Sequence, residues 1–248
     1  MVGMNETPEI YGRRILRSNW DLLGTSDQSR GIAAPNQQKP HDPGARTLEL
    51  PAIGPETFRG TDLADALFNR RSCRSYADAP LTLAQLAFLL AATQGLSPTR
   101  ENRRFRTVPS AGARHPFETY VAAMHVTDLE PGLYRYLQFD HRLCEIRLGP
   151  DLRPAAEQAI HGQGWGAPVL FFWTAIPYRS EWRYAAASHK LIALDAGHMC
   201  QNLYLACEAI GAGTCAIGAY DQALCDQFLG VDGTDELTVY AAPVGFWG

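Results

Sequence analysis

The sequence predicts an α+β fold, and three observations support this class. Two helical patterns come before any long strand, a hairpin pattern follows them, and strands then mix with helices toward the end of the chain. A regular alternation of strand and helix would instead favour a parallel α/β sheet. A long helix near residue 200 has so few polar residues that it must lie at the centre of a domain or in an obligate interface.

The two early helices have local start and stop signals. The stretch TDLADALFNRRSC carries apolar residues at helical spacing, and Thr61 is placed to cap its first turn. In LTLAQLAFLLAATQG, Thr82 and Gln85 form a capping-box pattern, and Gly95 is placed to end the helix.

Strand patterns fill the middle of the chain. After a loop at residues 97–117 come TYVAAMHVT, GLYRYLQF and RLCEIRL, the last two joined as a hairpin by a turn at residues 140–141. A short helix is predicted in DLRPAAEQAIHG, and the continuous apolar run of APVLFFWTAI predicts a buried strand.

The segment LIALDAGHMCQNLYLACEAIGAG predicts the long helix, over residues 191–210. Its apolar residues leave little polar face, so the helix is expected to be buried nearly all round, either in a dimer interface or at the centre of a monomeric core. Gly211 and Gly213 end it, and the strands GTCAIGAYD and ELTVYAAPVGF follow around a short helix near QALCDQFLG.

Residues 1–58 differ from the rest of the chain. The stretch GTSDQSRGIAAPNQQKPHDPGAR is polar, rich in Gly, Pro, Gln and Ser, and has neither a helical nor a strand period. We expect an extended or partly mobile arm with no core element, which could wrap a partner in a dimer, followed by one folded domain over residues 59–248.

Composition excludes several classes of protein. The net charge of −4 and the pI of about 6.0 argue against binding to nucleic acid or to an anionic membrane. No apolar run approaches the roughly 18 residues of a membrane-spanning helix. The N-terminal residues lack the apolar core of a signal peptide, so we expect a cytoplasmic protein.

Other enzyme and metal patterns are missing from the sequence. The six cysteines form no CxxC pair and no zinc-like spacing, so we expect buried thiols and neither disulfides nor a metal site. Nucleotide-binding and hydrolase signatures such as GxGxxG, GxxxxGK[ST], GxSxG and HExxH do not occur. Asp195 and His198 lie on the long helix, where the lone histidine is either a satisfied core residue or a catalytic group.

Three short motifs are candidates for ligand binding. RRSCR places three guanidinium groups and a hydroxyl within five residues, which suits phosphate oxygens but is also typical of a solvated helix end. The small residues of PSAGARHP allow a flat ligand to approach the backbone, and their amides are candidate donors, although the motif also suits a plain turn. GTCAIGAYD ends a strand without bulky side chains, as many turns do.

Taken in order, these motifs resemble the nitroreductase superfamily. RRSxR, the capped LTLxQLxxLLxAxxG helix, PSAG, EPGLYRY and LDAGHxxQNLYLACEAIG span about residues 60 to 246. Within the superfamily, the chain is most similar to the SagB-type branch, which includes azoline dehydrogenases of peptide natural-product pathways. The resemblance implies a central mixed, mainly antiparallel sheet flanked by helices, and an intertwined homodimer with two FMN molecules at the subunit interface.

The resemblance also implies which residues bind FMN. The arm that holds the phosphate and ribityl chain is Arg70, Arg71, Ser72 and Arg74. The loop that packs against the flavin from the other subunit is Pro109, Ser110, Ala111 and Gly112. The strand end under the isoalloxazine is Ile217, Gly218 and Ala219, and Gln163 falls where the family has a polar contact to the ring edge.

Three positions depart from the family pattern. Ala113 stands where many nitroreductases have asparagine. The catalytic Lys-Tyr pair of azoline dehydrogenases corresponds here to Arg183 and Tyr184, and an arginine cannot act as the same general base. Many relatives have basic residues after the last strand, where this chain reads FWG, so Lys190 or one of the arginines is expected to substitute.

The resemblance implies an FMN-dependent oxidoreductase that reduces a nitroaromatic, a quinone or a similar acceptor, with NAD(P)H as a candidate reductant. Arg183 and Tyr184 are the candidate substrate-facing residues, and Trp165 and Trp182 either line the same pocket or belong to the core. One alternative is dehydrogenation of an azoline or a related secondary-metabolite intermediate. Another is an FMN-binding protein without turnover.

Overall fold

A computed structural model describes residues 8–54, 57, 61–97 and 105–248. Its centre is a seven-stranded sheet with the order β1-β8-β7-β5-β9-β11-β10. In that order the strands are Thr47–Glu49, Arg142–Leu148, Gly132–Leu137, Phe117–Ala123, Val169–Ala175, Leu237–Phe246 and Ala212–Thr214. Each neighbouring pair is antiparallel, and a parallel pairing occurs in the separate sheet of β2 (Leu81–Thr82) and β6 (Val126–Thr127). The α+β class and the mainly antiparallel sheet are therefore confirmed.

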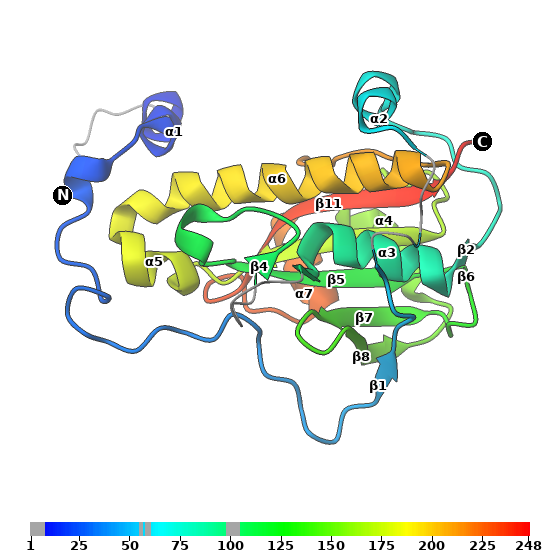
Figure 1. Ribbon diagram of the computed structural model, residues 1–248, viewed down its shortest axis with the longest axis horizontal. Coiled ribbons are helices and arrows are strands. Elements are labelled where there is room, and N and C mark those ends of the chain that lie inside the picture. Colours follow the sequence, from blue (N-terminus) through cyan, green and yellow to red (C-terminus); the bar gives the residue numbers. More distant parts are fainter. Residues whose placement is uncertain (1–7, 55–56, 58–60, 98–104) are drawn as a thin grey trace.

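Helices cover both faces of this sheet (Figure 1). Along β9, residues 169, 171, 173 and 175 pack in the hydrophobic cluster under α3 (Leu83–Gln94) and α6 (Ser188–Ala209). Residues 170 and 172 pack in the cluster under α4 (Leu152–Ala159) and α7 (Gln222–Leu229). Alternate strand residues point to opposite faces, so a strand with both faces covered must be apolar throughout, as APVLFFWTAI predicted.

The remaining elements are short. The helices are α1 (Pro8–Leu16), α2 (Leu63–Asn69) and α5 (Tyr178–Tyr184), and the 3-10 turns are η1 (Trp20–Leu22), η2 (Ala111–Ala113) and η3 (Ala185–Ala187). The strands β3 (Leu96–Ser97) and β4 (Phe105–Arg106) form a two-stranded antiparallel sheet. The predicted hairpin is β7 and β8, with His141 in its turn at a φ of 50°.

Local signals located the early helices well. In α3 the Gln85 N–H donates to Thr82 Oγ1 at 3.2 Å, and the Thr82 N–H donates to Gln85 Oε1 at 2.9 Å, so the capping box is confirmed. Helix α2 is capped by Asp62, one residue after the predicted Thr61, because the Asp62 carboxylate accepts from the Ala64 N–H at 2.8 Å.

Helix α6 forms as predicted but is not buried all round within one chain. Leu203 is 0% exposed and packs in the core under α3, whereas Leu194 is 50% exposed. Beyond the exposed His189 of the first turn, the exposed residues form a stripe at helical spacing, namely Ala193, Leu194, Gly197, His198 and Gln201. We call this stripe the outer face of α6.

The N-terminal residues contribute more structure than expected. Residues 8–50, here called the N-terminal segment, contain α1 and η1, cross the molecule in extended form, and end in β1 against β8 (Figure 1). Leu50 is 5% exposed and belongs to the main hydrophobic cluster. The expectation of no core element before Thr61 was therefore wrong, since a polar composition does not prevent a segment from pairing through its backbone.

The six cysteines are buried free thiols. Within the described ranges, no His, Cys, Asp and Glu side chains gather in threes or more as a metal site would need. No helix of the described chain is both long and apolar enough to cross a membrane.

Candidate functional site

The arginine segment, residues 70–74, follows α2 and is tied to the edge of the sheet. Ser72 forms a parallel bridge with Thr214 of β10. The Arg70 guanidinium lies over the Tyr204 ring, 5.2 Å from its centroid. Arg71 turns back to donate to the carbonyls of Phe68 and Arg70, and Arg74 is exposed. The segment is thus held by α6 and β10 while part of its positive charge faces solvent.

The strand end, residues 217–219, lies beyond β10. Ile217 is buried and pairs with Ala241 through hydrogen bonds of 2.8 and 3.1 Å. Gly218 and Ala219 are exposed, and a Cβ added to Gly218 would meet no atom within 4 Å. The Gln163 side-chain amide donates to the Ala219 carbonyl at 2.6 Å. The structure therefore brings together two parts of the predicted FMN site that lie 56 residues apart.

Tyr204 connects the strand end to the arginine segment, and sequence reasoning missed it. Its hydroxyl accepts from the Ala216 N–H at 2.9 Å and lies 2.9 Å from Ser72 Oγ. The only signal in the sequence was a hydroxyl within an otherwise apolar stretch of the long helix, which is also common in a protein core.

The small-residue loop, residues 109–112, is fixed by Asp195 of α6. Ser110 Oγ donates to Asp195 Oδ2 at 2.6 Å and accepts from the His115 N–H at 2.8 Å. The Ala111 N–H donates to Asp195 Oδ1 at 3.1 Å. The suggestion that the amides of this loop serve as ligand donors is therefore wrong for Ala111, because a carboxylate of the same chain occupies it.

Asp195 is a buried carboxylate with a structural role in this loop. It is 4% exposed, and burial raises its pKa, while the hydrogen bonds from Ser110 and Ala111 act in the opposite direction. His198 Nδ1 lies 3.9 Å from Asp195 Oδ1. The core interpretation of His198 is wrong, because its side chain is 49% exposed, and Asp195 is the buried residue of this pair.

Arg183 and Tyr184 lie against the same small-residue loop. Gly112 has a φ of +57°, and a Cβ there would collide with the Tyr184 hydroxyl and lie 3.0 Å from Arg183 Nε. The Arg183 guanidinium stands 5.5 Å from the centroid of the Tyr184 ring, whose other neighbour is the Trp20 ring at 5.6 Å. The predicted substrate-facing pair and one predicted cofactor loop are thus adjacent, and glycine is required where they meet.

Trp182 does not line an open pocket. It is 7% exposed, its indole N–H donates to the Ile32 carbonyl at 2.8 Å, and the Arg114 guanidinium covers its ring at 4.6 Å. Of the two interpretations given to Trp182, the core one is correct. Trp165 is half-buried in the turn after α4, with a φ of 47°.

Buried arginines make the interior behind this loop positive. Glu118 is 0% exposed and accepts from Arg179 at 2.6 Å and from Arg135 at 3.3 Å. Burial, and then the charges of Arg106, Arg114 and Arg179, lower the pKa of His115 to about 3. The pKa of Arg114 is lowered by burial and then by Arg183, so a positive potential extends to the Arg183–Tyr184 pair.

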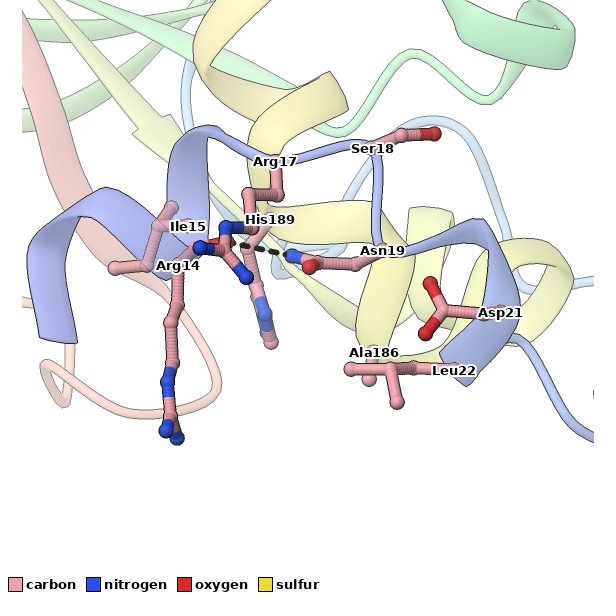
Figure 2. Close-up of a pocket in the computed structure, with 9 residues that line it drawn as sticks. All are labelled: Arg14, Ile15, Arg17, Ser18, Asn19, Asp21, Leu22, Ala186 and His189. Atoms are coloured by element: carbon pink, nitrogen blue, oxygen red, sulfur yellow. Dashed lines mark hydrogen bonds between the residues drawn. The ribbon is translucent and has the colours of Figure 1, made fainter. Parts of the chain in front are cut away.

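A cavity of about 600 Å³ lies between the N-terminal segment and the start of α6 (Figure 2). Its lining residues are Arg14, Ile15, Arg17, Ser18, Asn19, Asp21, Leu22, Ala186 and His189. Figure 2 shows Asn19 held by the hydrogen bond from its side chain to the Arg14 carbonyl, at 2.8 Å. No residue of the predicted FMN site lines this cavity, although it adjoins η3, directly after Tyr184.

The predicted site residues therefore fall into two clusters along α6. One gathers at Tyr204 and the other at Asp195, nine residues earlier, which is about 14 Å along a helix. Lys190 lies 14 residues before Tyr204, about 21 Å along the helix, so it cannot supply a phosphate contact to the arginine segment of its own chain.

Comparison with known proteins shows the following similarities. The model of the nitroreductase family matches residues 67–246. The Methanocaldococcus jannaschii protein MJ1384, whose name assigns it provisionally to the nitroreductases, is 35% identical over 161 residues, which are 64% of this chain and 79% of that protein. The trifolitoxin-processing protein TfxB of Rhizobium leguminosarum bv. trifolii is 29% identical over 174 residues, which are 66% of this chain but 46% of TfxB.

A solved structure is similar to this chain in fold as well. The crystal structure of an Anabaena variabilis protein described provisionally as a nitroreductase matches with a TM-score of 0.68 and 25% identity. The match covers 83% of this chain and 42% of that one, so this chain spans less than half of both that protein and TfxB.

Proposed function

The chain belongs to the nitroreductase family, and on that premise we propose that it is an FMN-dependent oxidoreductase. It would pass electrons from a reductant to an electron-poor small molecule such as a quinone or a nitroaromatic. The similarity to TfxB agrees with the SagB-type branch to which the motifs point. The single observation that carries the proposal is the junction of the arginine segment and the strand end at Tyr204.

The residues at this junction fit FMN. Arg70, Arg74 and Ser72 provide guanidinium and hydroxyl donors of the kind that phosphate requires. Gly218 leaves its position open, so a flat ring can approach the backbone there. Gln163, fixed against the Ala219 carbonyl, stands at the edge of the same surface.

We infer that a second copy of the chain completes the site. The small-residue loop meets α6 about 14 Å from Tyr204, so loop and junction do not meet within one chain. The outer face of α6 is exposed, and so are Leu63, Leu67 and Phe68 of α2. Apolar surface of this kind is typical of a homodimer interface. A homodimer would cover it and bring the loop and the Arg183–Tyr184 pair of one copy toward the junction of the other.

FMN, when bound, supplies hydride or single-electron transfer. An arginine side chain does not act as a general base in proteins, so the role of Arg183 is to attract and orient an electron-rich part of the substrate. The Tyr184 hydroxyl, which lies against the loop beside it, can donate a hydrogen bond or a proton. NAD(P)H remains the candidate reductant.

A second candidate function is oxidation of an azoline or a related intermediate in peptide maturation. The similarity to TfxB, a protein named for toxin processing, favours it. The arginine at position 183 weighs against it, because this residue cannot serve as the general base that a lysine provides.

The test starts from the purified full chain, which should be yellow and carry about one FMN per chain, released on denaturation. The bound flavin is reduced anaerobically, and quinones, nitroaromatics and azoline peptides are compared. Reoxidation by quinones or nitroaromatics supports the first function. Flavin reduction by an azoline peptide supports the second, and binding without turnover supports an FMN carrier. A colourless protein that takes up no added FMN would rule out all three.

A further inference from the structure

We propose that Tyr204 is a positioning residue that presents the Ser72 hydroxyl as a hydrogen-bond donor to the FMN phosphate. The inference rests on the proposed function, because it assigns a role in the same cofactor site. It starts from one hydroxyl that joins two backbone segments more than 140 residues apart, at Ser72 and Ala216.

One of the two hydrogen bonds has a fixed direction, and the proposal assigns the direction of the other, in which either hydroxyl can donate. The Ala216 N–H can only donate, so at 2.9 Å the Tyr204 oxygen is its acceptor. The phenol then has its own hydrogen to give, and Ser72 Oγ lies 2.9 Å away. With the phenol hydrogen on Ser72 Oγ, the Ser72 hydrogen is not needed between the two side chains and can turn outward.

The surroundings hold Tyr204 and Ser72 in this arrangement. Tyr204 is 8% exposed on α6, and the Arg70 guanidinium covers its ring. The backbone beside Ser72 is fixed as well, because Ser72 bridges Thr214 and the Cys73 N–H donates to the Thr214 carbonyl at 2.9 Å. A hydrogen bond donated by Tyr204 to Ser72 Oγ would keep the Ser72 hydrogen from turning back toward the phenol before the ligand arrives.

An outward hydroxyl beside exposed guanidinium groups suits an anion. A donor fixed in advance costs less entropy on binding than one that must be ordered by the ligand. The lower entropy cost strengthens binding of the FMN phosphate and does not affect the isoalloxazine. Riboflavin, which has the same ring but no phosphate, is therefore the control ligand.

The test uses Tyr204→Phe, which keeps the ring under Arg70 and removes only the hydroxyl. Dissociation constants of the full-length apo-protein for FMN and for riboflavin are measured by flavin fluorescence. We expect FMN to bind about tenfold more weakly and riboflavin to change less than about twofold. The control is Tyr134→Phe on β7. It removes a hydroxyl that donates to the Glu130 carbonyl at 2.6 Å. It should leave both constants unchanged.

A double-mutant cycle with Ser72→Ala decides whether Tyr204 acts through Ser72. If it does, Tyr204→Phe adds no further loss of FMN affinity once Ser72 is alanine. Additive losses would overturn the proposal. So would equal losses for FMN and riboflavin, or a lower apo-protein Tm with an unchanged ratio of the two constants, since these indicate a structural role only.

Three further outcomes can be told apart. If Tyr204→Phe does not fold, Ser72→Ala alone must still weaken FMN and spare riboflavin, and equal effects would overturn the proposal. If the wild-type chain binds no FMN, the proposed function fails and this inference fails with it. If the wild-type chain binds FMN and Tyr204→Phe does not alter the affinity, only this inference fails.

Discussion

Arg74 is exposed in the arginine segment and, unlike Arg71, does not turn back to the carbonyls of Phe68 and Arg70, which makes it a direct probe of phosphate binding. We expect Arg74→Ala to weaken FMN binding by about 1.5–3 kcal/mol, the contribution of one charge-assisted contact. The Tm of the apo-protein should hardly change, because an exposed side chain contributes little to stability. FMN titration and thermal unfolding of the apo-protein measure the two effects.

Arg46→Ala is the matched control, since Arg46 is also exposed but forms ion pairs with Glu130 and Glu145 on another part of the molecule. It should not alter FMN affinity. An Arg74→Ala variant with unchanged affinity and a collapsed Tm would show that the arginine segment is structural.

His115 predicts a pH dependence of stability. Its folded-state pKa is about 3, lowered from 6.5 mainly by burial and then by the neighbouring arginines. Above pH 6.5 both folded and unfolded states hold it neutral, and below that only the unfolded state takes up the proton. From this residue alone, the free energy of unfolding should therefore fall between pH 6.5 and 3, by at most about 1.4 kcal/mol per pH unit.

His115→Asn should remove that slope, since asparagine tolerates the φ of 49° at this position. Denaturant unfolding at pH 7 and pH 5 measures the free energy of unfolding of both proteins. Between these two pH values, wild type should lose about 2 kcal/mol more than the variant. His125→Asn, at a half-exposed histidine, should keep the wild-type slope. Identical slopes in wild type and His115→Asn would contradict the prediction.

Among single residues, the sequence identified those whose chemistry is evident from residue type. The arginines and Ser72 suggested phosphate on their own, and the resemblance added Gln163 and the strand end, which the structure brings into contact. Tyr204 and Asp195 were missed as contact residues because each lies within an apolar helix pattern. Their partners, Ser72 and Ser110, are 132 and 85 residues away in the chain.

Among the elements, α6 gives the clearest prediction. Its outer face should form the homodimer interface, so Leu194→Glu should yield a folded monomer with weakened FMN binding. Leu203→Glu should instead unfold the chain, because that side chain is 0% exposed in the core of one copy. Leu203 is therefore the wrong position for testing the dimer.

Sedimentation of the holo-protein with circular dichroism separates these effects. Ile146→Glu, at a side chain 44% exposed on β8, is the control and should remain dimeric. A wild-type protein that sediments as a yellow monomer would contradict the interface, as would a Leu194→Glu variant that stays dimeric and retains FMN.

Helices with local start and stop signals were easier to predict than the side of each helix that packs against the sheet. The capping box of α3 lies within four residues, so the sequence contains all of it. The outer face of α6 contains Ala193, Leu194 and Gly197, which differ little in polarity from the inner face. The periodicity could therefore indicate the helix but not which side of it contacts the sheet of its own chain.

For the whole molecule, the N-terminal segment divides into a dispensable part and an essential part. Residues 37–40 accept hydrogen bonds from buried side chains: Arg106 and Gln138 donate to the Gln37 carbonyl, and Arg135 donates to the carbonyls of Lys39 and Pro40. Removing these acceptors would leave four buried donor contacts unmade, at about 1–3 kcal/mol each, against a total stability of about 5–15 kcal/mol.

We therefore expect that deletion of residues 2–24 leaves a folded protein with a similar Tm, whereas deletion of residues 2–50 prevents folding. Circular dichroism and limited proteolysis compare the two. A folded product of the longer deletion would show that the segment is only an appended arm, as the division into residues 1–58 and 59–248 predicts. That division rested on side-chain composition, and composition does not report backbone carbonyls, which here accept the hydrogen bonds from Arg106, Arg135 and Gln138.

The position of the N-terminal segment has a consequence for protein synthesis. Lys39 pairs with Glu236, 197 positions later, and β1 pairs with β8, a strand translated nearly 100 residues after it. At about 5–20 residues per second, roughly 10–40 s pass between the emergence of Lys39 from the ribosome and that of its partner. During that time the Lys39 ammonium remains hydrated, and β8 stays an open strand edge until β1 docks. The N-terminal segment is thus synthesised before the strand and the carboxylate that it contacts.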